Sequence, residues 1–199
     1  RARATPGGGS VAAVMGSYGA ALVCMVTGLS LTGRKFAAIK QEMLDHRHSC
    51  ETNRGVLMDL VEKDSEAFEK VMEAYKLPEG SEEEKDRKEE AVEEATIHAA
   101  EIPLETMKQS YEALAHAKVA AEKGNINAIT DAGGAAYALS AAIKAAALNV
   151  KINLDNIKDK KFVKNTREEV DEIMEESEKL KDEILEIVEA RMEELASSD

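Results

Sequence analysis

The chain has 199 residues, a length typical of one domain, and its 44% hydrophobic content excludes a globally disordered chain. Aromatic residues make up only 4%, so small residues must fill much of the core, and three prolines are too few for an all-β protein. The formal net charge of −13 disfavours a nucleic-acid partner, because the phosphate backbone repels an acidic surface.

Residues 4–33 carry no charged side chain, and the stretch from Ser10 to Leu31 is long enough to cross a membrane. Its glycines lower its hydropathy, however. We therefore expect a helix buried on all sides in a soluble bundle, with no membrane partner.

Residues 36–76 contain no proline, and their apolar side chains recur with a period near 3.5, which predicts one long amphipathic helix. Ser81 begins a second helix, because Glu84 three residues later completes a capping box. This acidic helix is expected to run to Glu101.

Pro103 lacks an N–H group, and its ring clashes with the carbonyl four residues back, that of Ala99, so we expect a kink there. The helical pattern resumes over residues 104–123. Residues 126–150 are dense in alanine and predict a second interior helix.

We expect a lysine-containing connection over residues 153–165 and a final amphipathic helix over residues 170–195. The predicted fold is an all-α bundle, in which two buried small-residue helices are wrapped by longer amphipathic helices. It forms one domain over residues 1–199, with the C-terminal amphipathic helix within residues 166–199.

Three consecutive glycines, Gly7 to Gly9, precede Ser10 at the start of the uncharged helix. The free N–H groups of a helix N-terminus form an anion site, and glycine permits close approach of a ligand. Two interpretations stay open: a ligand-binding loop, or a flexible entry loop in which Ser10 or Gly9 caps the helix.

Asp131 is an acid within an apolar helix. It is either a desolvated functional carboxylate or an acid that complements the helix dipole near its N-terminus. Asn149 lies 18 residues later, five full turns, and so shares its face, while Asn153 lies within about 40° of that face.

Asp64 occupies a position within the apolar stripe of the long helix. It is either a boundary residue paired with a cation or a functional carboxylate. Lys35 follows the uncharged helix and Lys76 ends the long helix, and a cation at a helix C-terminus complements the dipole.

Cys24 and Cys50 lack metal-ligand spacing and form no disulfide framework, which favours a reduced, cytoplasmic setting. The chain has no HExxH motif, and no metal site is expected.

The segment Thr5-Pro6-Gly7-Gly8-Gly9-Ser10-Val11-Ala12-Ala13, which opens the uncharged helix, resembles the formimidoyltetrahydrofolate cyclodeaminase family. The resemblance covers roughly residues 5–160. Further matches, in order along the chain, are Asp64-Ser-Glu-Ala-Phe68, Lys76-Leu-Pro78, Ile102-Pro103, Gly124-Asn125, Asp131 and Asn149-Val-x-Ile-Asn153-Leu.

The resemblance implies an all-α fold, a homodimer and a folate site in a cleft, with a tetrahydrofolate derivative as substrate and no cofactor. The expected reaction is hydrolysis of the methenyl bridge of 5,10-methenyltetrahydrofolate to 10-formyltetrahydrofolate, which we favour because the chain is free-standing. The alternative is the cyclodeaminase reaction, which releases ammonia. A second alternative is a non-catalytic helical protein that presents its acidic helix to a basic partner.

Both reactions need a proton acceptor and donor beside a carbon that lies between two nitrogens. The candidate catalytic residues are Asp131, Asp64 and Lys35. The candidate substrate-binding residues are Pro6, Gly7, Gly8, Gly9, Ser10, Lys76, Asn125, Asn149 and Asn153.

Overall fold

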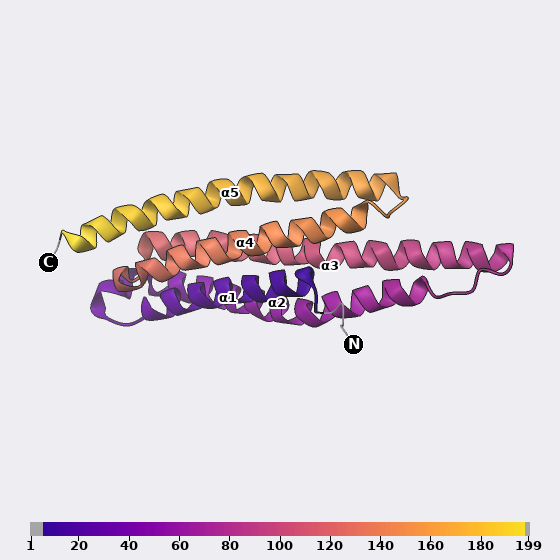
Figure 1. The fold of residues 1–199 in the computed structure, drawn as a ribbon. Coiled ribbons are helices and arrows are strands. Elements are labelled where there is room, and N and C mark those ends of the chain that lie inside the picture. The colour runs from indigo at the N-terminus through magenta and orange to yellow at the C-terminus, as the bar shows by residue number, and fades with distance from the viewer. Residues whose placement is uncertain (1–5, 198–199) are drawn as a thin grey trace.

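The computed structural model describes residues 6–197, which are almost entirely helical and contain no strand (Figure 1). Thr5, the first residue of the predicted glycine segment, lies outside the described residues. Five α-helices follow in order: α1 (Gly8–Leu29), α2 (Lys40–Ala74), α3 (Glu82–Lys123), α4 (Ile129–Leu154) and α5 (Lys160–Ala196). Two short 3₁₀ helices, η1 (Arg34–Ile39) and η2 (Ile126–Ala128), precede α2 and α4.

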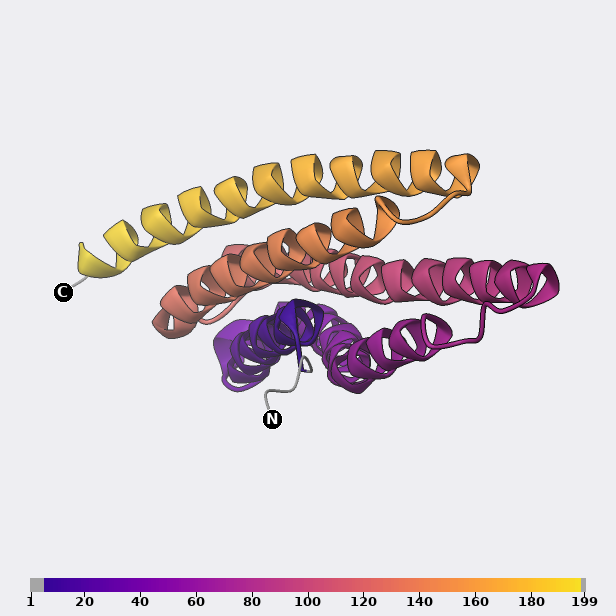
Figure 2. The ribbon, with the colours of Figure 1, turned by 45° about the vertical axis from the view of Figure 1, so that its right-hand side comes forward.

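The first four helices form a ring in which each packs against its two neighbours, and α5 lies across α3 and α4 outside that ring. Figure 2 shows the three resulting tiers, with α1 and α2 below, α3 and α4 in the middle, and α5 above. The all-α bundle predicted from the sequence is therefore confirmed.

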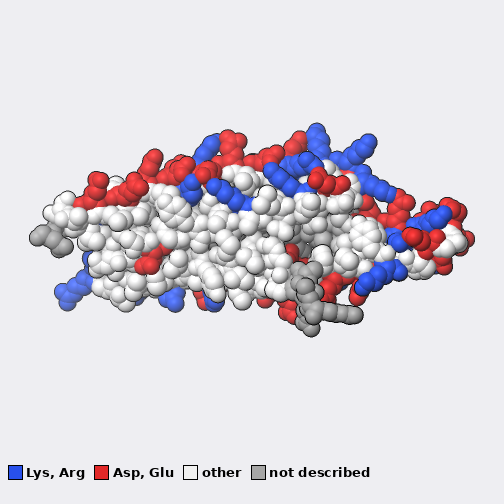
Figure 3. Space-filling model, viewed as in Figure 1, with Lys and Arg blue, Asp and Glu red and all other residues white. Residues whose placement is uncertain are grey.

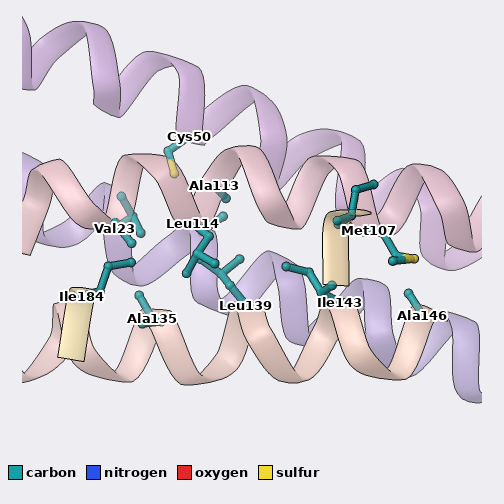
Figure 4. Close-up of a cluster of buried hydrophobic side chains, with 14 of the residues drawn as sticks. Val23, Cys50, Met107, Ala113, Leu114, Ala135, Leu139, Ile143, Ala146 and Ile184 are labelled. Atoms are coloured by element: carbon teal, nitrogen blue, oxygen red, sulfur yellow. The ribbon is translucent and has the colours of Figure 1, made fainter. Parts of the chain in front are cut away.

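The contact between α1 and its neighbours depends on glycine. A Cβ atom added at Gly19 would lie 2.6 Å from Cγ of Leu139 in α4, and one at Gly16 would lie 2.6 Å from Oγ of Ser110 in α3. Leucine side chains from the other helices fill the space that these glycines leave. The core around them is mostly alanine with larger residues between, including the fully buried Leu114, Leu139 and Ile143 (Figure 4).

The expectation that α1 is buried on all sides is wrong. Val11, Tyr18 and Met25, seven residues apart, are 52%, 66% and 41% exposed along one face. The reason is that α1 contacts α2, α3 and α4 on its other faces, and no described element covers this one.

Two segments, Gly8–Leu29 and Ile126–Leu154, are long and apolar enough to cross a membrane by length and composition alone. In the structure they lie side by side in the ring, and 56% and 50% of their most apolar windows are buried within the protein.

The predicted helix over residues 36–76 begins only at Lys40, because residues 34–39 form η1. The capping box is confirmed: the N–H of Glu84 donates to Oγ of Ser81, and the Glu84 carboxylate accepts from the Ser81 N–H. From there α3 runs through Pro103 without interruption to Lys123.

The predicted connection over residues 153–165 is too long, since only residues 155–159 separate α4 from α5. Asp159 caps α5 by accepting from the N–H groups of Lys161 and Phe162, at 2.9 and 3.0 Å. This local start signal places the beginning of the last helix ten residues before the predicted Val170.

Near the C-terminus of α5, Arg191 donates to the backbone carbonyls of Ala121 and Gly124, which end α3. These are carbonyls that a helix leaves without an internal partner. The Arg191 guanidinium therefore binds the C-terminal part of α5 to the end of α3.

Candidate functional site

A pocket of about 340 Å³ lies where the first turn of α1 meets α2, α3 and the last turns of α4. It is more enclosed than the larger hollows elsewhere on the surface. The residues that line it are Gly7, Gly8, Gly9, Asp64, Phe68, Val71, Ala99, Asn149, Ile152 and Asn153. Residues from four helices, up to 146 positions apart in sequence, thus converge on one cavity.

Asp64 is held in the pocket by Ser10. Its Oδ2 accepts from the backbone N–H of Ser10 at 2.7 Å and from the Ser10 hydroxyl at 2.8 Å. Gly7, at the N-cap position of α1, supplies no side-chain cap, so a carboxylate from α2 caps α1 instead. The positive end of the α1 dipole faces this carboxylate and stabilises its charge.

Gly9 makes this arrangement possible. A Cβ atom at position 9 would lie 2.0 Å from Oδ1 of Asp64, far inside van der Waals contact. Gly8 and Gly9 therefore allow side chains of α4 and α2 to approach α1 closely. Because Gly7 occupies the N-cap position, the interpretation in which Ser10 or Gly9 caps the helix is wrong. The backbone of Gly9 lies against the Asp64 carboxylate and also lines the pocket.

Two asparagines of α4 form the opposite wall. The amide nitrogen of Asn149 donates to the Ala145 carbonyl at 2.8 Å, and a Cβ atom at Gly8 would lie 3.1 Å from that nitrogen. The amide nitrogen of Asn153 donates to the Ala99 carbonyl of α3, also at 2.8 Å. In both side chains one amide N–H is engaged, which leaves the oxygen to accept from a ligand and the second N–H to donate to it.

The apolar part of the wall was missed by the sequence analysis. Phe68, Val71, Ala99 and Ile152 contribute it, and Phe68 and Ile152 are 41% and 62% exposed. A signal was available, since Phe68 and Val71 follow Asp64 by four and seven residues and so share its face of α2. The C-terminal part of the apolar stripe on α2 is therefore pocket wall.

The structure does not bring Asp131, Lys35 or Asn125 to this pocket. Asp131 lies in the first turn of α4, and the 18 residues that align it with Asn149 also separate the two by about 27 Å along the axis. Lys35 is exposed in η1, beyond the opposite end of α1. Asn125 caps η2 by accepting from the N–H of Asn127, at that same end.

Pro6 and Lys76 are exposed near the pocket end of the bundle, and neither lines the pocket. Lys76 lies two residues past the end of α2. Of the candidate residues, the structure therefore joins Gly7, Gly8, Gly9, Ser10, Asp64, Asn149 and Asn153 in one site.

A second polar cluster lies between α2 and α3. Nδ1 of His46 and Nδ1 of His116 are 2.9 Å apart, with the rings in an edge-to-face arrangement. Burial, and next the electrostatic interaction with His46, lower the pKa of His116. Among residues 6–197, no group of three or more histidine, cysteine, aspartate or glutamate side chains is arranged to hold a metal ion.

Comparison with known proteins identifies the family. The model of the formiminotransferase-cyclodeaminase family matches residues 1–172. The chain belongs to the formiminotransferase-cyclodeaminase family. This membership confirms the resemblance carried by the glycine segment and the motifs that follow it.

Relatives in the formiminotransferase-cyclodeaminase family carry two different names. A methenyltetrahydrofolate cyclohydrolase of Methylorubrum extorquens is 35% identical over 188 residues, which cover 94% of this chain and 90% of the relative. A formimidoyltransferase-cyclodeaminase of Gallus gallus is 36% identical over 174 residues, 87% of this chain but only 32% of that protein. A crystal structure of formiminotetrahydrofolate cyclodeaminase from Thermotoga maritima superposes with a TM-score of 0.86 at 33% identity, covering 96% of this chain and 91% of that one.

Proposed function

We propose that this protein hydrolyses the methenyl bridge of 5,10-methenyltetrahydrofolate to 10-formyltetrahydrofolate in the pocket at the N-terminus of α1. The observation that carries the proposal is the Asp64 carboxylate, which lines the pocket and is fixed by two hydrogen bonds from Ser10. The Methylorubrum extorquens relative, matched over 90% of its length, supports this choice of reaction.

The substrate's chemistry fits an anionic pocket. The methenyl carbon lies between N5 and N10 and shares a positive charge with them, so a nearby carboxylate stabilises the bound substrate electrostatically. Water adds to this carbon and loses a proton, which gives a tetrahedral intermediate. The bond from the carbon to N5 then breaks as N5 takes up a proton and the added hydroxyl group loses its proton to solvent, which leaves a formyl group on N10.

Asp64 is the group we assign to these proton transfers. Its carboxylate accepts the proton of the attacking water and returns one to N5 as the carbon–nitrogen bond breaks. General acid–base catalysis of this kind contributes roughly 10²–10⁴-fold to the rate. Asp131 and Lys35, the other candidate catalytic residues, lie at the opposite end of the bundle and have no part in the proposed mechanism.

The remaining pocket groups bind and orient the substrate. Phe68, Val71 and Ile152 supply apolar surface for the flat ring system, and the amide oxygens of Asn149 and Asn153 accept from its N–H groups. The N–H groups of Gly8 and Gly9 belong to the first turn of α1, where a helix offers donors without internal partners.

The cyclodeaminase reaction is the second candidate, favoured by the similarity to the Thermotoga maritima structure. There N10 attacks the formimino carbon attached to N5, and ammonia leaves as a proton is delivered to it. The same pocket and the same carboxylate serve this step, because the reacting carbon again lies between N5 and N10. All relatives reported above carry the names of enzymes, which favours either reaction over a non-catalytic interaction protein.

The test is an absorbance assay of the purified protein on 5,10-methenyltetrahydrofolate and on 5-formiminotetrahydrofolate side by side. We expect turnover of the methenyl compound above the uncatalysed rate. The Asp64→Asn variant keeps the shape of the side chain and an oxygen for Ser10, and should lose about 10²-fold or more in kcat. Turnover of the formimino compound alone would select the second reaction, and an active Asp64→Asn variant would remove Asp64 from either mechanism.

We propose further that the protein is a homodimer, with a second copy covering the exposed face of α1 and α4. No residue of α1 is charged, and Figure 3 shows a broad face over these two helices with few Lys, Arg, Asp or Glu side chains. On α4, Tyr137, Leu148 and Ile152 are 61%, 70% and 62% exposed. Contiguous apolar surface of this kind is typical of an interface rather than of a free surface.

We also propose a cytoplasmic location. Cys24 and Cys50 are both buried free thiols, as expected for a protein that resides in a reducing compartment. A fusion to a fluorescent protein expressed in the source cell would test this, and export of the fusion would contradict it.

A further inference from the structure

Pro103 lies in the interior of α3 and is buried. Proline has no backbone N–H group, so the carbonyl of Ala99, four residues earlier, has no donor within its own helix. An interior proline also costs helix stability. Neither cap, turn nor helix end explains its presence at this position, because α3 continues for another 20 residues.

The missing donor comes from another helix. The amide nitrogen of Asn153, in the last turn of α4, donates to the Ala99 carbonyl at 2.8 Å. Ala99 and Asn153 both line the pocket described above. The gap that Pro103 creates in the α3 ladder is therefore filled by a side chain of the candidate site.

We infer that Pro103 is a positioning residue, which fixes the carboxamide of Asn153 by leaving the Ala99 carbonyl free to accept from it. With one N–H of the amide committed to Ala99, the carboxamide of Asn153 is fixed in orientation, and its oxygen is placed to accept from an N–H group of the ligand. The chemical class so selected is a ring that carries N–H or amino donors on its edge, as a reduced pterin does. The identity of this ligand rests on the proposed function.

Replacing Pro103 with alanine reverses this arrangement. The new N–H group at position 103 donates to the Ala99 carbonyl in the ordinary helical pattern, and the ring no longer pushes that carbonyl outward. Asn153 then loses a firmly placed acceptor, and its carboxamide is free to turn. The helix becomes more stable while the pocket becomes less ordered.

The kinetic test compares Pro103→Ala, Asn153→Ala and the double variant on 5,10-methenyltetrahydrofolate. We expect Pro103→Ala to melt at a higher temperature than the wild type and to raise KM about tenfold with kcat within about twofold, the pattern of a lost binding contact. Because both changes act on one contact, the double variant should match Asn153→Ala within about twofold. An unchanged KM in Pro103→Ala, or effects that multiply in the double variant, would overturn the inference.

Gly55→Ala is the matched control for a stiffened helix. Gly55 lies in the interior of α2, and a Cβ atom there meets nothing within 4 Å. This variant should also melt at a higher temperature, with KM unchanged. A rise in KM in Gly55→Ala equal to that in Pro103→Ala would show that helix stiffening alone accounts for the effect.

A nuclear magnetic resonance measurement separates this inference from the proposed reaction. The side-chain amide signals of Asn153, assigned by their loss in Asn153→Ala, should be shifted and slow to exchange in the wild type. In Pro103→Ala they should move toward the values of solvent-exposed asparagines. Identical Asn153 signals in both proteins would overturn the inference whatever substrate is used, whereas a wild type inactive on both folates would overturn only the proposed function.

Discussion

Oδ2 of Asp64 accepts both the backbone N–H and the hydroxyl of Ser10, at 2.7 and 2.8 Å, across 54 positions of sequence. The Asp64 carboxylate thus caps the N-terminus of α1 and also lines the pocket. The two roles are joined through Gly9, because a side chain at that position would displace Asp64. Stability and activity are therefore coupled at the first turn of α1.

Gly9→Ala should harm both properties. The new Cβ atom would lie 2.0 Å from Oδ1 of Asp64, so the carboxylate must turn away and lose its bonds to Ser10. We expect a loss of about 1–2 kcal/mol in the free energy of unfolding, despite the better helix propensity of alanine, and at least a tenfold loss in kcat/KM. Urea unfolding and the absorbance assay measure the two effects. Wild-type stability in this variant would show that Asp64 does not cap α1.

Asp131→Asn should leave both turnover and folding nearly unchanged. Asp131 complements the dipole in the first turn of α4, at the end of the bundle away from the pocket, so its loss costs at most about 1 kcal/mol. Melting temperature and kcat are measured on the same preparation. A 10²-fold fall in kcat would return Asp131 to the mechanism and place the reaction elsewhere.

Leu148→Glu should weaken self-association. Leu148 is 70% exposed on the uncharged face of α4, and a buried unpaired carboxylate there would cost several kcal/mol in a dimer. Sedimentation velocity at micromolar concentration should show a dimer for the wild type and a monomer for the variant. Met58→Glu, which changes a residue of α2 that is 47% exposed, serves as the control and should remain dimeric. A monomeric wild type would contradict the proposed interface.

The stability of the protein should fall as the pH drops below the ordinary histidine pKa of 6.5. Burial lowers the pKa of His116 in the folded protein, so the unfolded chain takes up this proton first as the pH decreases. The contribution is fully present above pH 6.5 and is lost toward the lower pKa of the folded state. Urea unfolding at pH 7.5 and 5.5 should show a smaller decrease for His116→Gln than for the wild type. Equal decreases would mean that His116 does not contribute.

Most of the fold was predictable because its signals are local. The Ser81–Glu84 capping box and the uncharged stretch before Leu31 mark helices without reference to distant residues. The errors in the helix bounds have local causes too. Residues 34–39 form a 3₁₀ helix, and the cap at Asp159 starts α5 before the predicted position. Exposure of one face of α1 was not predictable, since composition does not reveal which neighbours a helix has.

The site was predictable only in part, because residues on one helix face can lie far apart along its axis. Asp131 and Asn149 share a face, but only Asn149 reaches the pocket. Asp64 stood out as a carboxylate in an apolar stripe, yet its partner, Ser10, depends on how α1 and α2 pack. The bond from Asn153 to Ala99 likewise follows from the antiparallel packing of α3 and α4, which no spacing in the sequence encodes.

Because α5 lies outside the ring, we expect its local stability and its tolerance of substitutions to differ from those of the other helices. No residue of α5 lines the pocket, and the family match ends at residue 172, within its first half. The ring of α1 to α4 contains the pocket, whereas α5 packs on its outside, where Val170 and Ile184 join the same core and Arg191 binds the end of α3. In native-state hydrogen exchange, α5 should open at a lower free energy than the ring, and substitutions on its outer surface should be the best tolerated in the protein.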